Sequence, residues 1–234
     1  MVRVITFDLD NTLWDVEPAL LRAEEAQAQW LREHRPQALA LLDDAALLAF
    51  KKNVWQRHPE LAHNMTQMRK QTLFELQTAA GYSELDARNG AEQAFAAFLQ
   101  QRHKVELYAE ALDIVAELAQ DYTLGALTNG NADIYKTAAG PYFEFAYLAE
   151  EVGASKPHPA LFEAALQATG ADPHRIVHVG DDPHHDIGGA KAMGLKTVWM
   201  NGRNKPWPGG ARADYEVTNL RDLPAAIRAL ARET

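Results

Sequence analysis

The chain contains no cysteine among its 234 residues, so disulfide bonds, zinc sites with thiolate ligands and cysteine nucleophiles are excluded. It has no apolar run that approaches the length of a membrane span, and its first residues lack the apolar stretch of a signal peptide. Basic residues number 23 against 32 acidic ones, and the net charge of −9 argues against nucleic acid or a membrane surface as partners. With 47% hydrophobic and 24% charged residues, we expect a globular cytoplasmic protein.

Strand and helix patterns alternate along most of the chain. An apolar, β-branched strand is predicted over residues 2–7, and it should be buried on both faces because its hydrophobic residues do not alternate strictly. Further strands are expected at 122–127, 145–148, 176–179, 197–200 and 215–217, with helices at 111–119, 132–139, 159–169, 186–193 and 223–231. This alternation is typical of an α/β fold with a doubly wound parallel sheet.

The segment that follows the first strand has a different character. Hydrophobic residues recur there with a helical period in four stretches, near 20–31, 45–55, 65–76 and 91–99, with almost no strand signal. Breaks fall at Pro36, Pro59 and Gly81. We therefore predict an all-α cap over residues 15–104, inserted into an α/β core formed by residues 1–14 and 105–234.

Polar residues follow four of the predicted strands. They are Asp8 and Asp10, then Thr128 and Asn129, then Lys156, and finally Asp181. Ligands of open parallel sheets bind at the carboxyl ends of the strands, so these side chains are expected at one edge of the sheet. Asp8 and Asp10, two residues apart on extended chain, should point the same way about 6–7 Å apart, which leaves space for a phosphate group.

This set of side chains suits phosphoryl transfer. One aspartate can attack phosphorus while the other handles the proton of the leaving group. Three carboxylates beside a phosphate dianion would repel one another, and Mg²⁺ is the expected counter-ion because it prefers oxygen ligands. Thr128 and the turn at Asn129 can hold phosphate oxygens, and Lys156 can neutralise the nucleophile and the phosphate.

Each of these signals has a simpler interpretation when taken alone. Asp8 and Asp10 can belong to a turn, Lys156 can be a surface lysine, and Asp181 can cap a helix. A zinc site built from histidines is disfavoured, because His184 and His185 are adjacent and should point apart. The joint appearance of the polar residues at four strand ends favours a catalytic site.

The same residues resemble the four motifs of the haloacid dehalogenase-like (HAD) hydrolase superfamily. The matching segments are Asp8-x-Asp10-x-Thr12, Thr128, Lys156-Pro157 and Gly180-Asp181-Asp182-x₃-Asp186, in the family's order along the core. The resemblance implies a Rossmann-like core, and the helical insertion is similar to the C1 cap of subfamily I.

The resemblance also implies roles for individual residues. Asp8 would form an aspartyl-phosphate intermediate and Asp10 would act as general acid and base. The carboxylates of Asp8 and Asp181 and the backbone carbonyl of Asp10 would hold Mg²⁺, and Asp186, with Asp182 beside it, would support these ligands. Haloacid dehalogenases carry a different residue at the position of Asp10, so the family pattern points to a phosphatase.

Substrate clues are weaker. The runs around Asp8, Asn129 and Asp181 are similar to bacterial phosphatases acting on FMN or a phosphorylated riboflavin precursor. In the cap, His63, Thr66 and Arg69 are spaced to lie along one side of a helix. They and Trp14 are candidate substrate contacts, with an ordinary solvated helix face as the alternative.

We therefore predict a Mg²⁺-dependent phosphatase whose partner is a small phosphorylated metabolite; the sequence does not predict an oligomeric state. A phosphomutase or phosphotransferase would use the same core residues. A phospho-accepting signalling receiver also gathers acidic residues, a hydroxyl and a lysine at strand ends, but such domains are shorter and lack the helical insertion. An inactive binding relative is disfavoured by the intact set of Asp8, Asp10, Lys156 and Asp181.

Overall fold

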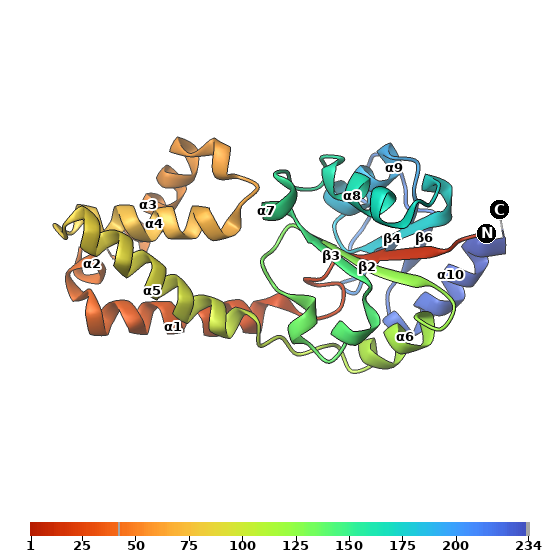
Figure 1. Cartoon of the computed structure of the whole chain (residues 1–234), viewed down its shortest axis with the longest axis horizontal. Coiled ribbons are helices and arrows are strands. Elements are labelled where there is room, and N and C mark those ends of the chain that lie inside the picture. The colour runs from red at the N-terminus through yellow and green to blue at the C-terminus, as the bar shows by residue number, and fades with distance from the viewer. Residues whose placement is uncertain (42, 233–234) are drawn as a thin grey trace. The chain divides into compact units, whose positions relative to one another are not determined.

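The computed structural model describes residues 1–41 and 43–232, which fold into two compact units. One unit combines Met1–Val16 with the chain from Val105 onward, and the other is formed by Glu17–Lys104. Figure 1 shows a sheet with helices in the first unit and helices in the second. Within the described residues, no helix is long and apolar enough to cross a membrane.

The first unit is built on a six-stranded sheet in which every neighbouring pair is parallel. The strand order is β3-β2-β1-β4-β5-β6. The strands are β1 (Val4–Phe7), β2 (Thr123–Thr128), β3 (Phe145–Leu148), β4 (Ile176–Gly180), β5 (Lys196–Met200) and β6 (Tyr215–Val217). The predicted α/β fold with a parallel, Rossmann-like sheet is confirmed.

The central strand β1 is buried on both faces, as its uninterrupted apolar sequence predicts. Successive side chains of a strand point to opposite faces, so Ile5 and Phe7 join one hydrophobic cluster and Val4 joins another. Phe7 pairs with Ala126 of β2 and with Val179 of β4. The register therefore places the residues that follow these three strands at one edge of the sheet.

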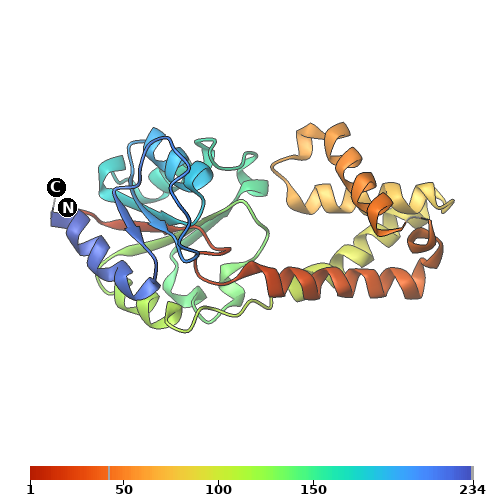
Figure 2. The ribbon, with the colours of Figure 1, turned by 180° about the vertical axis from the view of Figure 1, so that it is seen from behind.

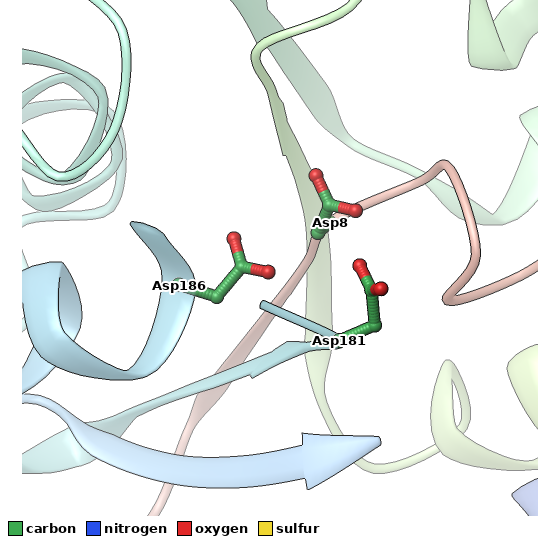
Figure 3. Close-up of side chains that lie close together, drawn as sticks. All are labelled: Asp8, Asp181 and Asp186. Atoms are coloured by element: carbon green, nitrogen blue, oxygen red, sulfur yellow. The ribbon is translucent and has the colours of Figure 1, made fainter. Parts of the chain in front are cut away.

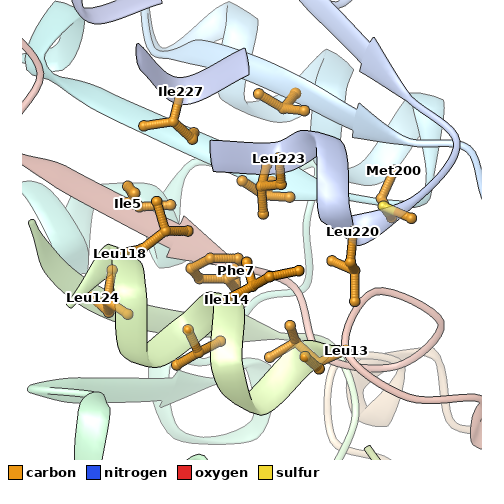
Figure 4. Close-up of a cluster of buried hydrophobic side chains, with 14 of the residues drawn as sticks. Ile5, Phe7, Leu13, Ile114, Leu118, Leu124, Met200, Leu220, Leu223 and Ile227 are labelled. Atoms are coloured by element: carbon orange, nitrogen blue, oxygen red, sulfur yellow. The ribbon is translucent and has the colours of Figure 1, made fainter. Parts of the chain in front are cut away.

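Helices cover both faces of the sheet (Figure 1). On one face, α6 (Ala111–Leu118) and α10 (Leu223–Arg232) pack their apolar side chains against β1. Figure 4 shows Phe7 among Ile114, Leu118 and Leu223 of this cluster. The opposite face is covered by α7 (Ala149–Val152), α8 (Ala160–Thr169) and α9 (Gly189–Ala192).

Two predicted helices of this unit take other forms. Residues 132–139, expected as a helix, contain only a 3₁₀ turn, Ile134–Lys136, and a second turn follows at Gly140–Tyr142. The side chain of Asp133 accepts a hydrogen bond from the backbone of Tyr135, and that of Thr137 donates to the carbonyl of Ile134. Such local side-chain bonds compete with helix continuation, and here they close a single turn.

The helix expected at 186–193 begins as a π-helical turn, Pro183–Gly188, and continues as α9. The backbone amides of Asp186 and Ile187 both donate to the carbonyl of Asp182, at 3.0 and 3.2 Å. The second of these bonds spans five residues and widens the turn.

The second unit contains the four helices that the hydrophobic period predicts, and a further short one. The helices are α1 (Val16–His34), α2 (Pro36–Ala40), α3 (Asp44–Arg57), α4 (Met65–Ala79) and α5 (Glu84–Arg102), with a 3₁₀ turn at Pro59–Leu61. Asn64 and Ser83 cap α4 and α5 by accepting hydrogen bonds from Gln67 N and Asp86 N. Helix α4 packs against α3 and α5, which can be followed from both sides in Figures 1 and 2.

Candidate active site

Three carboxylates from two neighbouring strand ends gather in the α/β unit. Asp8 directly follows β1, Asp181 directly follows β4, and Asp186 lies on the π-helical turn. One oxygen atom from each of these side chains lies within 4.8 Å of the others. Figure 3 shows the three side chains around a common space. Asp8 and Asp186 are buried and Asp181 is partly exposed.

Lys156 is the cation of this cluster. Its Nζ donates to Asp8 Oδ1 at 2.8 Å, lies 2.8 Å from Asp186 Oδ1, and also donates to the carbonyl of Leu127. The side chain is almost wholly buried, so the interpretation of Lys156 as a surface lysine is wrong. A buried ammonium is stable here because two carboxylates and a carbonyl replace its hydration.

The charges in the cluster perturb one another. Burial by itself would lower the pKa of Lys156, but Asp186 and Asp8 hold it above its usual value. Burial would raise the pKa of Asp186, whereas Lys156 and a hydrogen bond with His178 bring it well below its usual value. Burial, then the charge of Asp186, raises the pKa of Asp8 despite its contact with Lys156. Burial, followed by the charges of Asp186 and Asp182, raises the pKa of Asp181 to about 7.

The donor set fits a hard divalent cation. Three carboxylates face a single ammonium, which leaves an excess of negative charge in a largely buried space. The available ligand atoms are oxygens, which Mg²⁺ prefers. Asp8 and Asp181 supply the carboxylates that the family resemblance assigns to the ion, and Lys156 contacts both Asp8 and Asp186.

Asp10 and Trp14 form a pair that sequence reasoning did not connect. The indole Nε1 of Trp14 donates to Asp10 Oδ1 at 2.7 Å. The backbone amide of Asn11, which has a positive φ of 62°, donates to the carbonyl of Trp14 at 2.7 Å and closes the loop. Trp14 is fully buried and its indole orients Asp10, so its role as an aromatic substrate contact stays a prediction. The Asp10 carboxylate is not part of the triad of possible metal ligands in residues 1–41 and 43–232.

The loop after β2 is tied to the loop that carries Lys156. Asn129 Oδ1 accepts from the backbone amide of Lys156 at 2.7 Å, and Asn129 Nδ2 donates to the Lys156 carbonyl at 3.0 Å. Thr128 is buried, and its hydroxyl accepts from the backbone amide of Gly130 at 3.0 Å. The Asn129 side chain therefore positions Lys156, and phosphate binding by Thr128 and this turn stays a prediction.

Asp182 caps the π-helical turn. Its Oδ1 accepts from the backbone amides of His184 and His185 at 2.8 and 2.7 Å. Its own backbone amide donates to Asp186 Oδ2 at 2.9 Å. Asp182 thus supports Asp186 through its backbone amide, while its carboxylate caps the start of the π-helical turn.

Sequence reasoning missed the role of His178. Its ring is fully buried, with Nδ1 2.9 Å from Thr6 Oγ1 and Nε2 3.4 Å from Asp186 Oδ1. Burial lowers its pKa. A histidine within the otherwise apolar strand Ile176–Val179 was the available signal, because a buried polar ring needs hydrogen-bond partners.

The predicted substrate contacts of the helical unit lie on or near α4. His63 precedes the helix in a turn, so it does not continue the helical side of Thr66 and Arg69 as predicted. The Arg69 guanidinium contacts Glu24 at 3.1 Å and lies 3.7 Å from the centre of the Phe98 ring. Arg69 therefore joins α4 to α1 and α5 and is engaged within its own unit.

Comparisons with known proteins point to one family. The family model of haloacid dehalogenase-like hydrolases matches residues 2–194. A curated relative, 5-amino-6-(5-phospho-D-ribitylamino)uracil phosphatase YigB of Escherichia coli, is 30% identical over 97% of this chain and 96% of its own length. N-acylneuraminate-9-phosphatase of Mus musculus is 29% identical over 98% of this chain and 95% of its own length.

Solved structures agree in fold. A protein described as 2-haloacid dehalogenase from Pseudomonas syringae superposes with a TM-score of 0.92 at 37% identity, covering 98% of this chain and 99% of its own. A HAD phosphatase from Thermococcus onnurineus superposes with a TM-score of 0.70 at 23% identity, covering 97% and 98%. The family match over most of the chain, with phosphatases as its curated relatives, confirms the predicted hydrolase chemistry, and the chain belongs to the haloacid dehalogenase-like hydrolase family.

Proposed function

We propose that this protein is a Mg²⁺-dependent phosphatase that hydrolyses phosphate monoesters of small metabolites through an aspartyl phosphate on Asp8. The observation that carries the proposal is the contact of the Asp8 carboxylate with buried Lys156, beside Asp181 and at the carboxyl edge of the sheet. Lys156 opposes the effect of burial by favouring the charged form of Asp8, which is the form that acts as a nucleophile.

The proposed reaction has two displacements. A carboxylate oxygen of Asp8 forms a bond to phosphorus as the bond from phosphorus to the leaving oxygen breaks, and Asp10 gives its proton to that oxygen. Water then attacks phosphorus of the aspartyl phosphate, Asp10 takes the proton of this water, and phosphate leaves with Asp8 regenerated. The hydrogen bond from Trp14 fixes the Asp10 carboxylate for both proton transfers.

Mg²⁺ would be held by Asp8, Asp181 and the backbone carbonyl of Asp10, and when bound it supplies positive charge that offsets the negative charge of nucleophile and phosphate. Lys156 contributes positive charge from the side of Asp186. Thr128 and the backbone amides of the Asn129 turn are the proposed donors to the remaining phosphate oxygens. The helical unit is proposed to act as a cap that contributes to the choice of substrate.

For the substrate, one of the relatives that align over nearly the whole chain, at 30% identity, is a phosphatase of a riboflavin precursor. We therefore propose the phosphorylated ribitylaminouracil, with FMN as a second candidate, as the first metabolites to test. A phosphomutase or phosphotransferase on the same core remains the alternative, together with a non-enzymatic phospho-accepting domain.

A panel of phosphate monoesters incubated with the protein and Mg²⁺ tests the proposal through released phosphate. Release from small esters is expected, with complete loss in Asp8→Asn, because an amide is a far weaker nucleophile than a carboxylate. Migration of phosphate to a second hydroxyl without net release would identify a mutase. A long-lived phosphoprotein without turnover would identify the receiver type.

Because one similar solved structure is described as a 2-haloacid dehalogenase, the same experiment should also measure halide release. Expulsion of a halide needs no proton donor, whereas Asp10, oriented by Trp14, is placed to protonate an alkoxide. Halide release from 2-chloropropionate is therefore expected to be negligible beside phosphate release, and the opposite ranking would make the protein a dehalogenase.

A further inference from the structure

A pocket of about 270 Å³ opens beside the carboxylate triad and is formed wholly by the α/β unit. Asp181 belongs both to the triad and to the wall of this pocket. Its wall also contains the polar residues Asn11, Tyr108, Asn201, Arg203 and Lys205. None of these five has a role in the reaction proposed above.

The pocket adjoins the loop that carries the proposed proton donor. Asn11, in its wall, directly follows the proposed proton donor Asp10. In an in-line displacement the leaving oxygen is opposite the attacking carboxylate and close to the group that protonates it. The organic part of the ester therefore has space to extend past Asn11 and Asp181 into the pocket.

The part of the wall that follows β5 is a loop held in place by side-chain hydrogen bonds. Asn201 is buried, and its side chain accepts from the backbone amide of Lys205 at 2.8 Å and donates to the Lys205 carbonyl at 2.9 Å. Asn201 Nδ2 also donates to Oε1 of Glu216 of β6 at 2.7 Å. The backbone that carries Arg203 and Lys205 is thus anchored at both ends of this turn.

The charge of the wall is positive once the ion site is considered. Glu110, an acidic residue of the wall, is paired with Arg221 at 2.5 Å. Arg203 is exposed and lies 4.0 Å from the Asp15 carboxylate, at the outer limit of an ion pair. Because the proposed cation neutralises Asp181, Arg203 and Lys205 make the electrostatic potential in the pocket positive.

We propose that this pocket binds the organic part of the substrate and that Arg203 and Lys205 select phosphate monoesters bearing a second anionic group. The inference rests on the proposed phosphatase function and adds a specificity site within the α/β unit. It ranks small dianionic esters above the phosphorylated ribitylaminouracil and FMN, which have no second anionic group beside the phosphate. The pocket is smaller than the usual range for drug-sized ligands, so the group it accepts has few carbon atoms. Tyr108 and Asn11 add hydrogen-bonding groups suited to hydroxyls or to the anion itself.

The test uses pairs of unreactive phosphonate analogues, in which a C–P bond replaces the ester bond. Analogues of glycerate 3-phosphate and glycerol 3-phosphate have the same length and differ in one carboxylate, and a bisphosphonate provides a second anionic form. Affinity is measured by calorimetry with Mg²⁺ present. The wild-type protein is expected to bind the carboxylate-bearing analogue about tenfold more tightly, since hydrogen bonds to charged groups are the stronger ones.

The variant Arg203→Gln/Lys205→Gln is expected to lose that ratio, and added salt should reduce it in the wild-type protein. Arg212→Gln, an exposed arginine of the same segment outside the pocket wall, is the matched control and should retain it. A wild-type ratio near one, or an unchanged ratio in the double variant, would overturn the proposal. Because binding is measured without turnover, failure of the phosphatase function appears separately, as the absence of phosphate release from every ester.

Discussion

At the scale of single residues, the hydrogen bond from Trp14 to Asp10 favours one of two roles for this carboxylate, proton donor to the leaving group over general negative charge near the site. An oriented Asp10 can protonate a poor leaving group, whereas a merely acidic neighbour would act on every substrate alike. General acid catalysis contributes roughly 10²–10⁴-fold, so loss of the donor is measurable.

We predict that Asp10→Asn slows phosphorylation by alkyl phosphates by about 10²-fold or more and by nitrophenyl phosphate much less, since nitrophenolate needs little protonation. Trp14→Phe retains an aromatic ring but removes the indole N–H, and it should produce a weaker loss with the same ranking. Single-turnover rates on both substrates check this. Trp55→Phe, at an exposed indole of α3, is the control. Equal losses on both substrates would contradict the proton-transfer role.

Asp181 predicts how pH affects the metal-free protein. Burial, then the charges of Asp186 and Asp182, raises its folded-state pKa to about 7 from an ordinary value of 3.8. The folded state therefore binds this proton more tightly than the unfolded state does. The contribution of Asp181 to the free energy of unfolding is present at low pH and is lost as pH rises through about 7. Thermal unfolding in EDTA should show a melting temperature that falls between about pH 5 and pH 7 and then levels off. Asp181→Asn should remove much of that slope, and an undiminished slope would assign it to other groups.

The same shift determines the pH dependence of metal affinity. A cation must displace the proton from Asp181 below its pKa, so Mg²⁺ affinity should rise by up to about tenfold per pH unit and level off above about pH 7. Calorimetric titration with Mg²⁺ from pH 5.5 to 8.5 measures this. An affinity independent of pH would exclude Asp181 as a ligand.

At the scale of elements, Arg69 joins three helices of the second unit. Its contacts with Glu24 of α1 and with the Phe98 ring of α5 make it a structural residue of α4. The pair with Glu24 is partly exposed and contributes little by itself, while a close cation–π contact contributes about 0.5–2 kcal/mol.

We therefore predict that Arg69→Ala destabilises the protein by about 1–2 kcal/mol and leaves the ranking of small substrates unchanged. Urea unfolding followed by circular dichroism measures the stability, and kcat/KM for several esters measures the ranking. Arg88→Ala is the control, because Arg88 is exposed and pairs with Glu84 on its own helix. A changed ranking without loss of stability would restore Arg69 as a substrate contact.

At the scale of the whole molecule, the carboxylate triad lies in the α/β unit, so binding of Mg²⁺ to the triad should stabilise that unit. An ion that binds only the folded state stabilises it by about 2.7 kcal/mol at a hundredfold excess over Kd. Amide hydrogen exchange should slow around β1 and β4 on addition of Mg²⁺, while α2 to α5 change little, and EDTA should reverse the effect. Asp181→Asn should abolish this response. Uniform protection of both units would indicate that they respond to the ion together.

Local sequence patterns were enough to predict the order of the elements and the strand-end residues. The parallel order of strand and helix, the four helices between β1 and α6, and the placement of Asp8, Asp181 and Lys156 after strands all follow from hydrophobic period and from residues that end a strand. The family resemblance added the roles of these residues, because its motifs stand at the same strand ends.

Which of these side chains contact one another depends on the folding of distant segments. Lys156 is 148 residues from Asp8 and yet contacts it. Long-range packing excludes water from the Lys156 side chain, and the sequence around Lys156-Pro157 gives no sign of this burial. Asp186 joins Asp8 and Asp181 in the triad because a π-helical turn directs it there, and Trp14 turns inward to Asp10 because the Asn11 loop closes. These contacts depend on long-range packing and on hydrogen bonds competing with local helix formation, neither of which a periodic pattern records.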